Sequence, residues 1–181
     1  MSSERIVAVF GASASRPGDG HYEDGERCGR LLTEAGFGVV TGGYGGLMEA
    51  VSKGASAAGG HVLGVTVPSL FPERATGNEF LTEEWRAAHL MERIHELTEV
   101  SVASITLHGS IGTLVELAVA WNLAFVGKRA GQDPKPIITV GERWASLVPA
   151  LAEALETDES LVTVVDTVEE AVGVVEQRCR D

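Results

Sequence analysis

The stretch Leu107-His108-Gly109-Ser110-Ile111-Gly112-Thr113-Leu114-Val115-Glu116 joins an apolar, strand-like run at residues 102–107 to a helix-like run at residues 112–126. A glycine-bearing turn between a strand and a helix presents backbone N–H groups to an anion, and the helix dipole adds to the attraction. Glu116 lies about one turn into the helix, where a carboxylate would repel a phosphate that it faced. We therefore expect Glu116 to face the rest of the ligand, such as a sugar ring. The stretch predicts a site for a phosphorylated sugar or nucleotide.

The turn itself supplies the candidate phosphate ligands. These are His108, Gly109, Ser110, Ile111, Gly112 and Thr113. The alternative is an ordinary tight turn in which Thr113 caps the helix. His108, at the end of the strand, is placed to contact phosphate or to titrate near neutral pH, or it only fills space.

Outward from this stretch, strand-like and helix-length segments alternate along the whole chain. Strands are predicted at residues 5–10, 37–41, 61–67, 102–107, 136–140 and 161–165, and helices at residues 22–35, 47–58, 86–100, 112–126, 144–155 and 167–178. Residues 68–84 and 127–136 are predicted to be loops. The alternation is typical of an α/β fold with a doubly wound, mainly parallel sheet and helices on both faces. A length of 181 residues fits a single domain, residues 1–181.

Two more glycine- or serine-bearing loops follow predicted strands, at residues 11–15 and 42–46. Because ligands of open parallel sheets bind at the carboxyl ends of strands, we expect the three loops to gather around one crevice. Glycines at positions 42, 43, 45 and 46 (Gly42, Gly43, Gly45, Gly46) would let a ligand approach the backbone; alternatively they serve positive φ angles and close packing. Their spacing matches neither the dinucleotide fingerprint nor the Walker loop.

Charge and composition narrow the classes of partner. A net charge of −12 disfavours nucleic-acid polymers and anionic membranes, whereas a few N–H groups and single arginines still suffice for a small anion. There is no basic segment followed by an apolar stretch, and no apolar run of membrane-spanning length, so a soluble, cytoplasmic protein is predicted. Cys28 and Cys179 form no CxxC pair, and the five histidines have no ligand spacing, so neither a disulfide framework nor a metal site is expected.

At this point the motifs resemble those of the LONELY GUY phosphoribohydrolases, which are often called lysine decarboxylase-like. The family pattern Pro-Gly-Gly-x-Gly-Thr-x-x-Glu corresponds to residues 108–116, and Gly-Gly-x-x-Gly-Leu-Met corresponds to residues 42–48. A methionine followed by an arginine–lysine pair corresponds to Met91, Arg93 and Ile94. An early Gly-Ala-Ser loop ends here at Ser13.

The resemblance implies a Rossmann-like fold and hydrolysis of the N-glycosidic bond of a nucleoside 5′-monophosphate, either a cytokinin ribotide or an AMP-like nucleotide. The products would be the free base and ribose 5-phosphate, and no cofactor is required. It also implies that Arg93 and Glu116 are the functional arginine and glutamate, with substrate contacts from Ser13, Met91 and the two glycine-bearing loops. A homodimer with the site near the subunit interface is implied as well. The apolar helices at residues 86–100 and 112–126 could form that interface, or could equally pack inside one subunit.

Three positions depart from the family pattern. His108 stands in place of proline, Ser110 in place of the second glycine, and Ile94 in place of the lysine, which removes a positive charge from a site for a dianion. Residues 46–54 also look like a branch that includes proposed molybdenum-cofactor carriers. The alternative function is therefore a non-catalytic binding or carrier protein for a phosphorylated ligand, such as a nucleotide or the molybdenum cofactor.

The roles of single charged residues have alternatives too. Without the resemblance, Arg93 would be read as a residue of a solvated helix face, or as the partner of Glu96 or Glu99 in an ion pair. A glycosidase that uses two carboxylates would need an acid partner for Glu116, for which Glu49 and Glu92 are candidates. A decarboxylase that uses pyridoxal phosphate is disfavoured, because none of the three lysines is placed for a Schiff base.

Overall fold

A seven-stranded parallel sheet runs through the protein, for which a computed structural model describes residues 5–72 and 76–179. The strand order is β4-β3-β2-β1-β5-β6-β7. The strands are β1 (Ile6–Phe10), β2 (Gly38–Thr41), β3 (Val62–Thr66), β4 (Glu83–Arg86), β5 (Ser101–Thr106), β6 (Ile137–Val140) and β7 (Val162–Val165). The central strands are continuous apolar runs because helices cover both of their faces. The predicted α/β fold class is confirmed.

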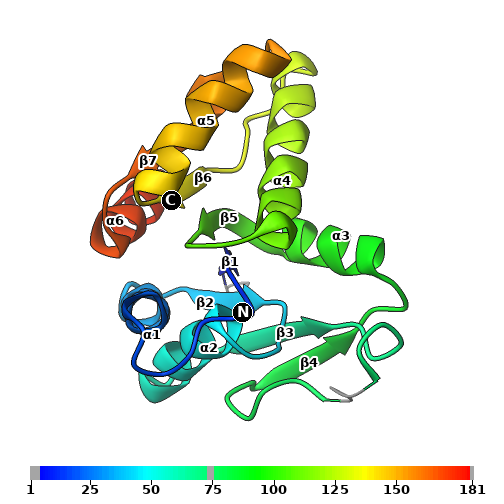
Figure 1. The fold of residues 1–181 in the computed structure, drawn as a ribbon, viewed down its shortest axis with the longest axis vertical. Coiled ribbons are helices and arrows are strands. Elements are labelled where there is room, and N and C mark those ends of the chain that lie inside the picture. The colour runs from blue at the N-terminus through cyan, green and yellow to red at the C-terminus, as the bar shows by residue number, and fades with distance from the viewer. Residues whose placement is uncertain (1–4, 73–75, 180–181) are drawn as a thin grey trace.

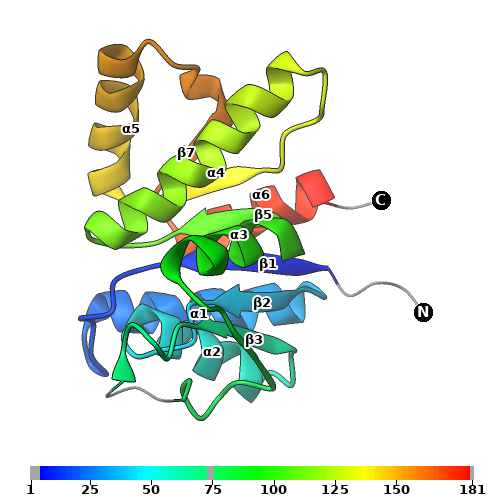
Figure 2. The same ribbon diagram turned by 90° about the vertical axis from the view of Figure 1, so that its right-hand side faces the viewer.

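Helices form a layer on each face of this sheet (Figures 1 and 2). They are α1 (Gly20–Glu34), α2 (Leu47–Ala57), α3 (Leu90–Val100), α4 (Ile111–Arg129), α5 (Glu142–Leu155) and α6 (Val168–Cys179), with a 3₁₀ turn, η2, at Glu159–Leu161. Buried side chains of α1, α2 and α6 pack with one face of the sheet. Those of α3 pack on the other face beside β1–β3, and those of α4 and α5 pack there beside β6 and β7.

The order of the strands reverses between β1 and β5, so the chain leaves β1 toward one face and leaves β5 toward the other. The loops that follow β1, β2 and β5 meet at this switch point. The Ala12 N–H donates to the carbonyl oxygen of His108 (2.9 Å), and the Leu47 N–H donates to the carbonyl oxygen of Ala12 (2.9 Å). The predicted convergence of the three loops is therefore confirmed at the level of the backbone.

The prediction that residues 68–84 are a loop, followed by a helix from Arg86, is wrong for residues 83–89. Residues 83–86 form β4, the edge strand paired with β3, and α3 begins only at Leu90 after His89, whose side chain accepts a hydrogen bond from the Glu92 N–H. The strand has no apolar alternation because it is largely exposed at the edge of the sheet. Its formation depends on main-chain pairing with β3, a contact between segments that are distant in the sequence.

Helix α4 differs from the prediction in length and in apolar character. It continues to Arg129 rather than ending at residue 126, so the loop before β6 is shorter than predicted. Its 19 residues are long and apolar enough to cross a membrane, which makes the expectation of no such run wrong. A packed core helix meets the same criteria, and α4 packs beside β6 and α5 through Leu117, Trp121 and Ala124. On another side it exposes Ile111, Val115 and Val126.

Helices α1 and α2 cross so closely that a glycine is required at the crossing. A Cβ atom at Gly54 would lie 1.8 Å from the carbonyl oxygen of Glu26, a backbone atom that cannot turn away. We expect Gly54→Ala to lower the free energy of unfolding by about 1–3 kcal/mol. In α6, Gly173 has open space around it, so Gly173→Ala should raise that free energy by about 0.4–1 kcal/mol. Urea unfolding of both variants checks this, and equal effects would contradict the close crossing.

Candidate functional site

Helix α4 begins with backbone donors that nothing in the helix satisfies. Ser110 is the N-cap residue, its side chain makes no capping hydrogen bond, and the first helical bond runs from the Leu114 N–H to the Ser110 carbonyl oxygen (3.0 Å). The N–H groups of Ile111, Gly112 and Thr113 therefore lie ahead of the first helical acceptor. Such a terminus attracts an anion through both its free N–H groups and its dipole.

The residues of this turn have different surroundings. Thr113 is buried and packs against Gly109, where a Cβ atom would lie 2.3 Å from the Thr113 Oγ1. Thr113 is therefore a packing residue in the first turn of α4, and the alternative that it caps the helix is wrong. Ser110, Ile111 and Gly112 are exposed, and a Cβ atom at Gly112 would meet open space. An anion can reach the terminus from this open side.

Arg93 is buried, with 8% of its surface exposed, although it is a charged residue on a helix. Its Nε donates to the carbonyl oxygen of Val65 (2.9 Å), its Nη2 lies 3.5 Å from the Met48 Sδ, and its guanidinium lies over the Tyr44 ring at 5.8 Å. The alternatives of a solvated helix face or an ion pair with Glu96 or Glu99 are wrong within the described residues. Burial lowers the pKa of Arg93, and Glu116 and Tyr44 act in the opposite direction.

The glycine at position 42 makes room for this arginine. A Cβ atom at Gly42 would lie 1.5 Å from the Arg93 Nη2. Gly46 has a positive φ of 72°, and a Cβ atom there would lie 2.5 Å from the Ala12 carbonyl oxygen. Gly43 faces Thr66 and Gly64, and of the four glycines only Gly45 has little around it, with the Glu49 Oε2 at 3.9 Å. Close packing, rather than ligand approach, accounts for positions 42, 43 and 46.

Glu116 carries a carboxylate without a hydrogen-bond or ion-pair partner among residues 5–72 and 76–179. Burial raises the pKa of Glu116 to about 7, and the nearby Arg93 acts to lower it. Each of the two groups thus shifts the pKa of the other, which places them in one electrostatic environment. An unpartnered carboxylate with a pKa near neutrality, beside a buried cation, is typical of a catalytic or binding site.

His108 does not stand alone, and its neighbours were not predicted from the sequence. Its ring stacks on that of His21 with centroids 3.8 Å apart, and both line a cavity of about 390 Å³ with Arg143. Burial lowers the pKa of His108, and the neighbouring His21 and Arg143 act in the same direction. The Arg143 Nη1 donates to the carbonyl oxygen of Gly109 (2.6 Å) and so braces the turn. Both new residues follow strand ends, which is the one signal that could have identified them.

The remaining predicted residues lie at various distances from this centre. Ser13 is exposed and borders Gly46, whereas Met91 is exposed on α3 (64%). Ile94 is buried in the core, so its position offers no charge to a ligand. Both candidate acid partners have other contacts: Glu49 accepts from the Tyr22 Oη (2.8 Å), and Glu92 accepts from the Ala88 N–H (2.5 Å). Neither hydrogen-bonds to Arg93 or Glu116.

Metal binding has no candidate site in the part of the chain that the structure describes. No group of three or more histidine, cysteine, aspartate or glutamate side chains lies close enough there to hold an ion. The groups that the structure places around the start of α4 are the Glu116 carboxylate, the Arg93 and Arg143 guanidinium groups, the stacked rings of His21 and His108, and the helix terminus itself.

Comparison with known proteins identifies relatives by sequence. A family model described as the SLOG cluster4 family matches residues 4–172. The cytokinin riboside 5′-monophosphate phosphoribohydrolase LOG7 of Arabidopsis thaliana is 31% identical over 151 residues, which are 83% of this chain and 68% of LOG7. LOG3 of the same plant is 28% identical over 97% of this chain and 84% of its own length. The probable enzyme LOGL5 of Oryza sativa subsp. japonica is 30% identical, and this chain spans 61% of its length.

Solved structures share the fold across nearly the whole chain. The molybdenum cofactor binding protein of Rippkaea orientalis superposes with a TM-score of 0.78 at 21% identity, over 99% of this chain and 100% of that one. The structure of TM1055 gives a TM-score of 0.74 at 26% identity, over 96% and 99% of the two chains. The chain is thus similar in sequence to phosphoribohydrolases and similar in fold to a cofactor-binding protein. The choice between these two functions has to come from the chemistry of its own site.

Proposed function

Because the chain belongs to the SLOG cluster4 family, as its resemblance to the LONELY GUY proteins predicted, we propose that it hydrolyses the N-glycosidic bond of nucleoside 5′-monophosphates. The substrate is a cytokinin ribotide or an AMP-like nucleotide, and the products are the free base and ribose 5-phosphate. The observation that carries the proposal is the unpartnered carboxylate of Glu116, one turn beyond the free N–H groups of α4 and beside Arg93.

The proposed mechanism assigns the carboxylate to the sugar. Cleavage of the N-glycosidic bond builds positive charge on the ribose as the base departs, and a fixed negative charge nearby stabilises that transition state. Glu116 has no hydrogen-bond or ion-pair partner among the described residues, so its oxygens are available to a ribose hydroxyl or to the attacking water. With a pKa of about 7, it can accept a proton from that water near neutral pH.

The phosphate is assigned to the turn before α4. The N–H groups of residues 111–113 would hold its oxygens and so fix the ribose for attack. Arg93, which interacts electrostatically with Glu116, would neutralise the phosphate or assist the leaving base. Since its Nε is occupied by Val65 and its Nη2 faces Met48, its orientation is set before any ligand arrives.

Direct assay of base release tests the proposal. Purified protein is incubated with AMP, with a cytokinin ribotide and with the other common nucleoside monophosphates, and the free base is followed by chromatography. Release of base together with an equal amount of ribose 5-phosphate is the expected result. A protein that releases no base from any member of the panel is not a phosphoribohydrolase.

A carrier for a phosphorylated ligand, such as a nucleotide or the molybdenum cofactor, is the second candidate function. The observation in its favour is Ile94, because the buried isoleucine leaves Arg93 as the single cation of that helix turn near Glu116. One cation suits binding of a ligand without strong stabilisation of a transition state. Calorimetric binding of intact AMP with a one-to-one stoichiometry, in a protein that releases no base, would favour the carrier.

The proposed assembly is a homodimer formed through the exposed apolar side of α4 and the start of α3. Ile111 (74% exposed), Met91 (64%) and Val126 (56%) would otherwise leave large apolar side chains in water. Val126→Glu is expected to convert a dimer of 19.0 kDa chains into a monomer in sedimentation equilibrium. Leu155→Glu, at an equally exposed position on α5, is the matched control and should leave the dimer intact. A wild-type monomer would contradict this assembly.

A further inference from the structure

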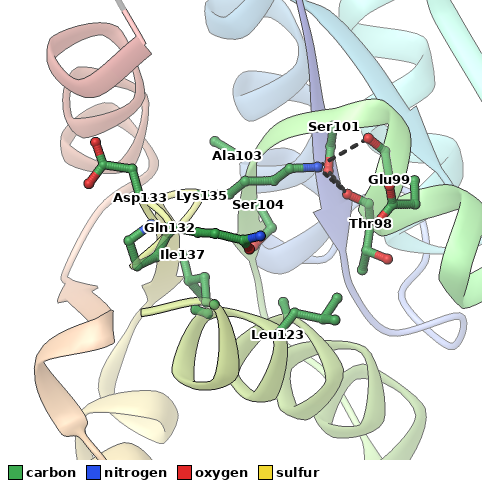
Figure 3. Close-up of a pocket in the computed structure, with 14 residues that line it drawn as sticks. Thr98, Glu99, Ser101, Ala103, Ser104, Leu123, Gln132, Asp133, Lys135 and Ile137 are labelled. Carbon is green, nitrogen blue, oxygen red and sulfur yellow. Dashed lines mark hydrogen bonds between the residues drawn. The ribbon is translucent and has the colours of Figure 1, made fainter. Parts of the chain in front are cut away.

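A second cavity, of about 210 Å³, lies at the opposite edge of the sheet from Glu116 (Figure 3). Its floor is formed by the first residues of β5 and β6, and its walls by the second half of α4, the end of α3 and the loop before β6. The catalytic loops follow the carboxyl ends of the strands, whereas this cavity adjoins their amino ends. It is therefore separate from the proposed active site.

The walls of this cavity are mainly apolar and built from small side chains. Ala103 and Ile137 come from the sheet, and Ala120, Leu123 and Ala124 come from α4. The small side chains of Ala120 and Ala124 leave space between the helix and the sheet. The volume is below the range of roughly 300–1,000 Å³ that is typical of pockets for drug-sized ligands, so it suits a single small ring system.

One residue in the lining of this cavity carries a buried hydroxyl group without a hydrogen-bond partner among the described residues. Ser104 is 6% exposed, lines the cavity, and its Oγ has no hydrogen-bond partner among the described residues. Figure 3 shows the amide end of the Gln132 side chain directed toward Ser104 from the loop. Buried hydroxyl groups are normally hydrogen-bonded, so an unpartnered one that lines a cavity marks a place for a ligand with polar edges.

The charges around the cavity select against anions. Its lining contains two acidic residues, Glu99 and Asp133, and one basic residue, Lys135. The Lys135 Nζ already donates to the carbonyl oxygens of Thr98 (2.8 Å) and Glu99 (3.1 Å), at the negative end of the α3 dipole. A phosphate would meet acidic side chains and an ammonium group that is already engaged. An uncharged ligand that donates hydrogen bonds fits better.

From these observations we propose that the cavity beside Ser104 is a second binding site, for a small uncharged heterocycle of nucleobase size. The ring lies between the sheet and α4, and its polar edge bonds to the Ser104 hydroxyl and the Gln132 amide. Size and charge both exclude a nucleotide. The site stands whether or not the protein is a hydrolase, because none of its residues belongs to the Glu116 centre.

Calorimetry with adenine as the probe tests this site on the full chain. Adenine is expected to bind to the wild-type protein, and Ser104→Val should weaken that binding by about tenfold or more. Thr139→Val is the matched control, since the Thr139 Oγ1 is likewise buried and unpartnered but does not line the cavity. It should bind adenine as the wild type does. Ala120→Leu, which adds bulk from the α4 wall, should weaken binding in the same way as Ser104→Val.

A competition experiment separates this cavity from the proposed active site. Adenine is titrated into Glu116→Gln protein that has been saturated with AMP, so that a hydrolase would not consume the nucleotide. Binding that persists supports a second site, whereas binding that AMP abolishes belongs to the Glu116 centre and overturns it. The second site is also overturned if adenine does not bind, or if wild type, Ser104→Val and Ala120→Leu bind it equally. The cavity would then hold only water. Failure of AMP hydrolysis, by contrast, affects only the proposed function.

Discussion

Glu116→Gln is expected to lower kcat for base release from a nucleoside monophosphate by about 10²–10⁴-fold, the usual contribution of a general base. Glutamine keeps the size of the side chain but can neither take a proton from water nor place a negative charge beside the ribose. Because Glu116 makes no hydrogen bond or ion pair with another described residue, the substitution breaks no native hydrogen bond or ion pair there. Steady-state assays of base release on both proteins measure the effect.

The pKa of Glu116 gives this prediction a second readout. Its pKa is raised from 4.5 to about 7, so the group is uncharged below that pH and active as a base above it. The wild-type kcat/KM should therefore rise as the pH passes through about 7, and a profile that is flat between pH 5 and 9 would contradict the assignment.

Stability provides the control for folding of this variant. A carboxyl group whose pKa is raised in the folded state stabilises the fold below its unfolded pKa, and that contribution is lost as the pH rises through about 7. Glutamine cannot ionise, so Glu116→Gln should unfold at a higher urea concentration than wild type at pH 8. Turnover that is unimpaired in a protein stabilised in this way would reject the role of Glu116.

Arg93→Met is expected to lower kcat/KM by roughly 30-fold or more, which corresponds to about 2 kcal/mol or more of lost transition-state stabilisation. Methionine fills the apolar part of the space beside Met48 and Tyr44 but carries no charge for the phosphate or the leaving base. Removing the guanidinium also removes the influence that lowers the pKa of Glu116. The midpoint of the pH profile should then move above that of the wild type.

Arg86→Met is the matched control for this second prediction. Arg86 lies on the exposed edge strand β4, where it pairs with Glu84 at 3.6 Å, so its substitution should leave both kcat/KM and the pH midpoint unchanged. If Arg93→Met lowered kcat/KM without moving the midpoint of the pH profile, Arg93 would act only by binding the phosphate. If it changed neither quantity, the assignment of Arg93 would be wrong.

Much of the fold was predictable because it depends on local patterns. The turn at residues 108–113 joins an apolar strand to a helix, and the structure places the start of α4 within one residue of its predicted start. By contrast, β4 was missed because pairing with β3 determines it. The span of α4 was underestimated because its last three residues, Gly127, Lys128 and Arg129, are a glycine and two charged residues that give no apolar signal.

The candidate site was predictable in part. Glu116 and the turn before it were identified from their position at the start of a helix, which is a property of neighbours in the chain. Arg93 was assigned by resemblance alone, since only the fold buries it between Val65, Met48 and Tyr44 and opposite Gly42. His21 lies in α1 and His108 in the loop after β5, so no local sequence pattern could predict that their rings stack.

The amino-acid sequence by itself determined the strand–helix alternation and the glycine-bearing turn before α4, because each depends on residues that are close together in the chain. The alternation in turn implied parallel pairing of the strands. Tertiary structure alone decided which charged groups lost their water. It buried Arg93, raised the pKa of Glu116 and left the buried Ser104 hydroxyl without a hydrogen-bond partner among the described residues. The physical reason is that desolvation depends on everything that packs around a group, and those neighbours come from elements far apart in the sequence.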